Sequence, residues 1–314
     1  MKSGNTRVLV VALAANLGIA AAKFAAAALT GSSAMLTEGV HSLVDSTNQV
    51  LLMYGQKRAA KPADARHPAG YGRELYFWSF VVALLVFALG AGVSVFEGFH
   101  HLLQPEKAVS PLIGYLVLAV AFALEGGSTV TAFREFDAAR RGKSWWRALI
   151  DTKDATTVIV LLENGAAMAG ILIAALGLGL SQLTGDAHFD GMASVLIGLL
   201  LGVVAIFLAR EAKGLLIGEA ADPMLVEGIR RAASRAGITG IGEIMTIHNA
   251  PEQIVAALNV DFDNRLSAGD VERIVDEIER AVQQQFPSVT RVYVRPHEDA
   301  GLKFGLDRGL VCHE

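Results

Sequence analysis

The chain has 314 residues, of which 53% are hydrophobic and 18% are charged, and its formal net charge is −4 at pH 7. Because the charged residues gather in a few short segments and in the last third, this composition is typical of a membrane protein followed by a soluble domain. The single cysteine, Cys312, excludes an intrachain disulfide and a thiolate metal cluster. From Lys213 onward there are 16 Asp and Glu against 11 Lys and Arg, which argues against a nucleic-acid partner.

Six segments are apolar and long enough to cross a hydrocarbon core of about 30 Å, which takes about 20 helical residues. The first begins near the N-terminus. It is too long for the core of a signal peptide and further spans follow it, so we expect it to be retained. Small residues are frequent in these segments, which predicts a closely packed bundle. The segments are residues 8–29, 34–55, 77–100, 110–132, 155–180 and 189–210.

The connections between these segments differ in charge. Residues 56–75 and 133–150 carry five Lys or Arg each, whereas the three connections on the opposite side carry one in total, Lys107. By the positive-inside rule the basic loops, both termini and the C-terminal part of the chain are cytoplasmic. We therefore expect an integral membrane protein of the bacterial inner (cytoplasmic) membrane. The three connections on the opposite side are residues 30–33, 101–109 and 181–188.

From about residue 213 the pattern is that of a small soluble domain. Two segments have helical periodicity, residues 223–236 and a longer one from Ser267 to near Pro287. Three further segments are typical of strands, residues 241–247, 254–262 and 289–294. The order helix–strand–strand–helix–strand predicts an α+β sandwich with one face of its sheet covered.

The chain is therefore expected to be an α-helical membrane protein with six transmembrane helices and a small cytoplasmic α+β domain. We place the transmembrane domain at residues 1–212 and the α+β domain at residues 213–296. Residues 297–314 are expected to form a loosely ordered tail.

The second apolar segment carries polar side chains that a simple span does not need. His41 and Asp45 are four residues apart, so on a helix they share one face and can bind one ion. A neutral imidazole nitrogen and a carboxylate oxygen are ligands that zinc accepts. We expect Asn48 to support these ligands, and Glu38 either to support them or to bind the ion. The alternative is that these groups only hydrogen-bond between helices, which in lipid contributes about 1 kcal/mol each.

Two ligands do not hold an ion, and the fifth segment supplies the best further candidates, Glu163 and Asn164. Glu163 has no polar residue three or four positions away, so it is expected to meet a different helix. We therefore predict a metal site formed by His41, Asp45, Glu163 and Asn164. A polar contact between helices is again the alternative.

The first basic loop contains Asp64 and His67, which are candidates for a weak metal site. The alternative is a turn that Pro68, Gly70 and Gly72 build and that charge pairs anchor.

Other charged residues are expected to have structural roles. Lys23, Glu97 and Glu125 lie near the ends of spans or have side chains that can reach the membrane interface. In the C-terminal domain the histidines and carboxylates lack metal-ligand spacing, which favours a solvated acidic face over a metal site.

Three stretches of the sequence carry a resemblance to a known family. They are Thr30-Gly-Ser-Ser-Ala-Met35, Glu38-Gly-Val-His41-Ser-Leu-Val-Asp45 and His67-Pro-Ala-Gly-Tyr-Gly-Arg-Glu74. With six spans and a small C-terminal domain, the chain resembles the cation diffusion facilitators, which are zinc-transporter-like metal/proton antiporters. The resemblance implies that His41 and Asp45 are half of a transport site whose other half lies on the fifth span. It also implies a metallochaperone-like α+β domain that dimerises in the cytoplasm.

The fifth span departs from the pattern of that family. The expected ligand positions fall near Leu161 and Gly165, which cannot coordinate a metal. The run Leu161-Leu-Glu163-Asn164 resembles a branch of the family that reads Leu-Leu-Glu-Asp at this place.

Three other positions depart as well. Tyr71 stands where some members have a second histidine in the loop. Asn259 and Glu272 stand where some members have histidines in the C-terminal domain, so a binuclear metal site is not expected there.

Together these observations predict a homodimeric secondary transporter and not an enzyme. We expect it to export a divalent metal ion in exchange for protons by alternating access, with Zn²⁺ as the leading candidate for the ion. Its partners would be the metal ion, protons, the lipid bilayer and a second copy of the chain, with no cofactor beyond the transported ion. Fe²⁺, Mn²⁺, Co²⁺ and Cd²⁺ are alternative ions, because oxygen-rich sites select poorly among them. A membrane metal sensor or scaffold without transport is the alternative function. An intramembrane metallohydrolase is disfavoured because the spans hold no HExxH motif.

Overall fold

The computed structural model describes residues 3–105, 111–140, 142, 144–152 and 154–297. The chain divides into two compact units, Met1–Ile217 and Gly218–Glu314. The predicted domain boundary at residues 212 and 213 falls inside the last helix of the first unit, which continues to Ile217. Apart from His297, the predicted tail lies outside the described residues.

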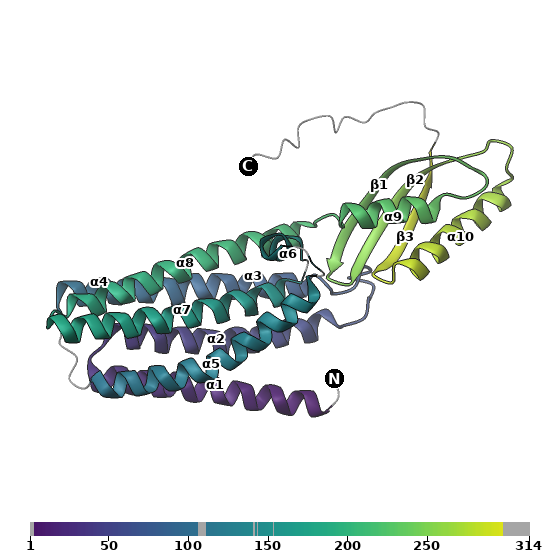
Figure 1. The fold of residues 1–314 in the computed structure, drawn as a ribbon. Helices are drawn as coiled ribbons and strands as arrows, with labels where there is room; N and C mark the ends of the chain where they lie inside the picture. Colours follow the sequence, from purple (N-terminus) through teal and green to yellow (C-terminus); the bar gives the residue numbers. More distant parts are fainter. Residues whose placement is uncertain (1–2, 106–110, 141, 143, 153, 298–314) are drawn as a thin grey trace. The chain divides into compact units, whose positions relative to one another are not determined.

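The first unit is a bundle of helices (Figure 1). One of them, α2, packs against α1, α3, α4, α7 and α8, so it is largely surrounded by protein. α5 packs against α1 and α7. The described elements are α1 (Ser3–Thr30), α2 (Ser33–Ala59), α3 (Glu74–Leu85), the π-helical segment η1 (Val86–Ala91), α4 (Gly92–Leu103), α5 (Pro111–Ala139), α6 (Trp145–Asp151), α7 (Ala155–Thr184) and α8 (His188–Ile217).

Within the described residues, four helical segments are long and apolar enough to cross a membrane. They are Glu74–Leu103, Leu112–Ala138, Thr156–Thr184 and His188–Ile217. In α1, the part that the structure describes with its side chains contains a shorter apolar stretch, Asn16–Thr30. α2 is less apolar because it carries Glu38, His41 and Asn48, which are all buried in the bundle. Four of the expected segments are thus long apolar helices, and the six-span arrangement stays a prediction.

The third expected span is one continuous helical rod with a π-helical turn at Val86–Ala91 between α3 and α4. Hydropathy does not report which carbonyl each N–H group bonds, so the sequence did not indicate this turn. Past it, α4 lies very close to α8. A methyl group on Gly98 would overlap Val195, and one on Gly198 would overlap Val95. The two glycines therefore permit the close packing that the small residues predicted.

Side chains fix where two of the helices begin. Ser32 precedes α2 and accepts a hydrogen bond from the backbone of Met35. Asp154 precedes α7 and accepts hydrogen bonds from the backbones of Thr156 and Thr157. Such capping satisfies N–H groups that have no partner inside the helix. The short helix α6 lies in the second basic loop, where the sequence predicted no element.

The second unit has the predicted order of elements. They are α9 (Pro223–Ala233), β1 (Ile238–Ala250), β2 (Gln253–Phe262), α10 (Ala268–Gln285) and β3 (Val289–Pro296). The sheet order is β1-β2-β3, with β1 and β2 antiparallel and β2 and β3 parallel. Alternate residues of β2, including Ile254, Leu258 and Val260, form one core with Ile229 of α9 and Ile278 of α10. The small α+β domain is thus confirmed, and its likeness to a metallochaperone stays a prediction.

Candidate metal centre

The predicted pair on α2 lies inside the bundle, where His41 is buried and the Asp45 side chain is 22% exposed. His41 is 1% exposed, and its Nε2 lies 3.5 Å from Asp45 Oδ2, as the spacing of four residues on a helix predicts. In the described part of the chain, neither ring nitrogen of His41 nor Asp45 Oδ1 has a hydrogen-bond partner. A buried polar atom without a partner costs about 1–3 kcal/mol. The pair is therefore suited to hold a ligand that satisfies these atoms.

A second contact joins α2 to α7. Asn48, which is 0% exposed, donates a hydrogen bond of 2.6 Å from Nδ2 to Glu163 Oε1. Glu163 is buried as well, and this bond fixes the direction of its carboxylate. Glu163 thus meets a different helix, as predicted, and Asn48 is the residue that positions it.

A cavity of about 410 Å³ lies beside Asp45 and Glu163, one residue from each of these two contacts. Asp45 of α2 and Glu163 and Asn164 of α7 line it. Asn164 donates a long hydrogen bond of 3.4 Å from Nδ2 to Ser128 Oγ. His41 is not among the residues that line the cavity. The other polar lining residues are Asn16, Ser42, Gln49, Gln56, Glu125, Ser128 and Thr156.

The predicted ligands do not converge on a single point. Among the described residues, no three His, Cys, Asp or Glu side chains lie close enough together to hold one metal ion. The structure brings His41 next to Asp45, and it places Asp45, Glu163 and Asn164 around one cavity. Ligation of one ion by all four therefore stays a prediction, and it requires these side chains to move toward one another.

Lys23 of α1 lies beside this cavity. Lys23 has a structural role, as expected, but it has this role inside the bundle and not at the interface, because it is 0% exposed. Its Nζ lies 2.9 Å from Glu38 Oε2 and 2.9 Å from Glu125 Oε1. Glu38 is thus bound to Lys23 and is not hydrogen-bonded to His41 or Asp45. Opposite charges inside three apolar segments were the signal in the sequence, since a charge in lipid is almost always paired.

The start of α2 is held by a buried carboxylate of α8. Asp190 accepts hydrogen bonds from Ser32 Oγ at 2.7 Å and from the backbone N–H of Ser33 at 2.6 Å. The Nε2 atom of His101, on α4, lies 3.8 Å from Asp190 Oδ2. This cluster fixes the position of the helix that carries His41.

The loop before α3 has the geometry of a turn. Asp64 accepts hydrogen bonds from Tyr71 Oη at 2.7 Å and from the backbones of Arg66 and His67. The hydrogen bond from Tyr71, followed by that from the His67 backbone, lowers the pKa of the Asp64 carboxyl. Gly70 has a φ of 84°, which favours glycine. Because the carboxylate already accepts three hydrogen bonds, these contacts favour the turn over a metal site at Asp64 and His67.

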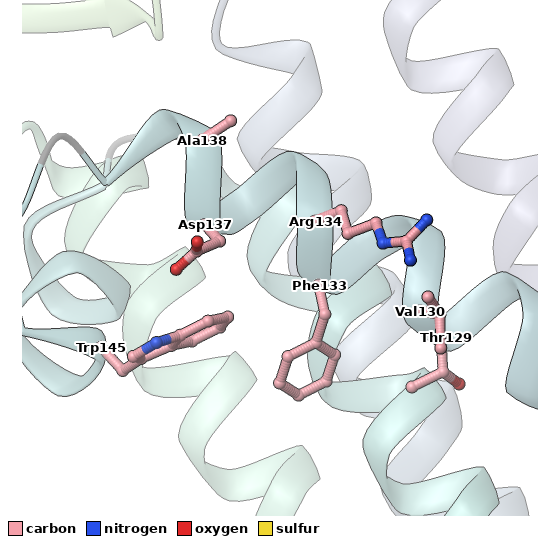
Figure 2. A pocket seen from close by; sticks show the side chains of 7 residues that line it. All are labelled: Thr129, Val130, Phe133, Arg134, Asp137, Ala138 and Trp145. Atoms are coloured by element: carbon pink, nitrogen blue, oxygen red, sulfur yellow. The ribbon is translucent and has the colours of Figure 1, made fainter.

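A second cavity, of about 520 Å³, lies against α5, and none of the candidate ligands lines it. Figure 2 shows Phe133 and Arg134 of α5 on its wall and Trp145 of α6 beside Asp137. The Asp137 carboxylate forms an ion pair with Arg140. A single, already paired carboxylate among aromatic and aliphatic side chains does not make a divalent-metal site.

Known proteins are similar to this chain over most of its length. Residues 9–217 match the model of the cation efflux transmembrane domain. The mitochondrial proton-coupled zinc antiporter SLC30A9 of Mus musculus is 31% identical over 285 residues, which are 88% of this chain and 50% of that protein. Metal tolerance protein C4 of Arabidopsis thaliana is 34% identical over 218 residues, which are 69% of this chain and 48% of that protein.

The match to a bacterial relative covers a larger share of that protein. The cation-efflux pump FieF of Yersinia enterocolitica is 24% identical over 260 residues, which are 82% of this chain and 81% of that protein. By contrast, the chain spans about half the length of the antiporter and of the metal tolerance protein.

Proposed function

The chain belongs to the cation efflux family, and from this premise we propose that it carries a divalent metal ion across a membrane. The observation that supports this most strongly is the His41–Asp45 pair on α2, whose ring nitrogens and one carboxylate oxygen are buried and have no hydrogen-bond partner in the described residues. The pair lies next to a cavity that also exposes Glu163 and Asn164. We propose that the resemblance of the sequence to the cation diffusion facilitators includes this metal site.

We propose Zn²⁺ as the cargo. An imidazole nitrogen together with carboxylate oxygens is a donor set that zinc accepts, and the relative from Mus musculus is named a zinc antiporter. The remaining donors of the cavity are oxygens of the Glu125 carboxylate and of amides and hydroxyls, which Fe²⁺, Mn²⁺, Co²⁺ and Cd²⁺ also accept. These ions are the alternatives that a competition assay must include.

The same chemistry supports exchange of the metal for protons. A metal ion binds a neutral imidazole and ionised carboxylates, so protonating His41, Asp45 or Glu163 releases it, and binding it expels protons. A site of this kind loads metal on the side with fewer protons and releases it on the other side. We propose that the bundle exposes the site to the two sides in turn, with export from the cytoplasm.

We also propose that the protein works as a homodimer in the bacterial inner membrane with both termini in the cytoplasm. The charge difference between its loops supports this orientation, and the bacterial relative FieF supports the membrane. A mitochondrial membrane is the alternative, because the relative from Mus musculus is named as mitochondrial.

Metal uptake into proteoliposomes with an imposed pH gradient tests the proposal. The wild-type chain should take up Zn²⁺ faster when the lumen is more acidic than the outside, and His41→Ala and Asp45→Ala should each abolish uptake. Thr47→Ala is the matched control, because Thr47 lies on the exposed side of the same helix and should transport like wild type. Uptake at the wild-type rate by both site variants would overturn the assignment of the site.

A metal sensor or scaffold without transport is the second candidate. The observation in its favour is that no three metal-binding side chains lie close together in the described part of the chain. It predicts zinc binding that depends on His41 and Asp45 without any uptake that follows the pH gradient.

A further inference from the structure

The ammonium group of Lys23 is enclosed by oxygen atoms of two other helices. Its Nζ donates hydrogen bonds to Glu38 Oε2 and Ser42 Oγ of α2 and to Glu125 Oε1 of α5. All three distances are 2.9 Å, and the side chain of Lys23 is 0% exposed. An ammonium group has three N–H donors, so every one of them is used.

Such an arrangement is the coordination shell of a cation. A charge in the hydrocarbon region of a membrane is stable only when opposite charges and hydrogen-bond partners replace its water. Glu38 is 0% exposed and the Glu125 side chain is 16% exposed, so neither carboxylate is compensated mainly by solvent. The Lys23 ammonium and the carboxylates of Glu38 and Glu125 therefore stabilise one another inside the bundle.

The neighbouring helix α7 leaves space for the Glu38 carboxylate that binds Lys23. Gly170 of α7 lies against Glu38, and a methyl group at this glycine would overlap Glu38 Oε1. Within the described residues, Glu38 Oε1 and Glu125 Oε2 have no hydrogen-bond partner. Ser42 and Glu125 also line the cavity that contains Asp45. The oxygen cluster is thus adjacent to the candidate metal centre but shares none of its proposed ligands.

We propose that Glu38, Ser42 and Glu125 form a second cation site of the membrane unit and that the tethered ammonium of Lys23 fills it. This internal cation holds α1, α2 and α5 together and takes the place of a second bound metal ion. One consequence rests on the proposed function: a single cargo ion per chain occupies the cavity, next to Asp45 and Glu163.

The test removes the ammonium and supplies it from solution. Lys23→Ala deletes a fragment that corresponds to n-propylammonium, so this ion is the probe. The full-length variant, purified in detergent, should have a lower Tm than wild type, and n-propylammonium chloride should restore at least half of the difference in a saturable manner. Tetramethylammonium chloride at the same concentration has no N–H donors and should restore none of it.

One further variant and the wild-type protein make the result specific. Lys23→Ala combined with Glu38→Gln and Glu125→Gln should no longer respond to n-propylammonium, and wild type should not respond either. If neither ion changes the Tm of Lys23→Ala, or if both raise it equally, the proposal is wrong. These readouts involve no transport, so they remain decisive whether or not the wild-type chain carries zinc.

If Lys23→Ala cannot be purified, the neutral combination Lys23→Met, Glu38→Gln and Glu125→Gln keeps the proposal testable. This combination should fold where Lys23→Met alone does not, because it leaves no carboxylate without a cation. Failure of both to fold would contradict the proposal, since the lysine would then be needed for a reason other than its charge.

Discussion

Asn48→Ala probes the contact that joins the two halves of the candidate centre. The Nδ2 atom of Asn48 donates to Glu163 Oε1 over 2.6 Å, and both side chains are buried. A hydrogen bond to a charged group contributes about 1.5–3 kcal/mol. Because about 1.4 kcal/mol equals a factor of ten in affinity, the variant should bind zinc about ten- to a hundredfold more weakly if this bond positions Glu163 for the cargo.

The assay is a competition titration of the full-length chain in detergent with a chromogenic zinc chelator. Glu163→Gln should lose at least as much affinity as Asn48→Ala. The double variant should lose no more than Glu163→Gln alone, because the two residues act through one contact. Thr47→Ala, on the exposed side of α2, is the control and should keep the wild-type Kd. A wild-type Kd for Asn48→Ala, or losses that add in the double variant, would refute the role given to this hydrogen bond.

Three further predictions concern the scaffold. Gly198→Val should lower the Tm by an amount that corresponds to about 1–3 kcal/mol, because the valine side chain would overlap α4. Gly127→Ala is the control and should not lower the Tm, because Gly127 has open space around it. Equal Tm values for the two variants would contradict the close packing. Asp190→Asn should destabilise the first unit by about 2 kcal/mol in thermal unfolding, because a buried carboxylate that accepts several hydrogen bonds is lost, and an unchanged Tm would contradict this. Hydrogen bonds from Arg265 lower the pKa of Asp263 from 3.8 to about 2, so their stabilisation is complete above pH 3.8 and is lost as the pH falls toward 2. The protection factors of amides in residues 262–272, which account for the pH dependence of intrinsic exchange, should therefore fall over this range in wild type and show no such step in Asp263→Asn.

The sequence predicted features that depend on one helix or strand at a time. The spacing of His41 and Asp45 alone places both on one face of α2, and their distance of 3.5 Å follows from helix geometry. Similarly, alternation along residues 254–262 predicts a strand with one buried face, and β2 spans Gln253–Phe262. Such patterns need no knowledge of the neighbouring elements.

Features that depend on how helices are rotated against each other could not be predicted. Asn48 and Glu163 are 115 positions apart in the sequence, and nothing in either helix specifies that they meet. The partners of Lys23 could not be predicted for the same reason. Its position in an apolar segment is compatible with a side chain that reaches the interface, and only the structure shows Glu38 and Glu125 on either side of it.

The central claim is that His41 and Asp45 bind the metal ion that the protein carries. Anomalous scattering at the zinc absorption edge from crystals of the full-length chain soaked in zinc tests it most directly. The claim predicts a peak at about 2.0–2.2 Å from a ring nitrogen of His41 and from a carboxylate oxygen of Asp45, with Glu163 or Asn164 as a further ligand. A peak only elsewhere, such as between Asp64 and His67, or no peak in this cavity, would contradict it.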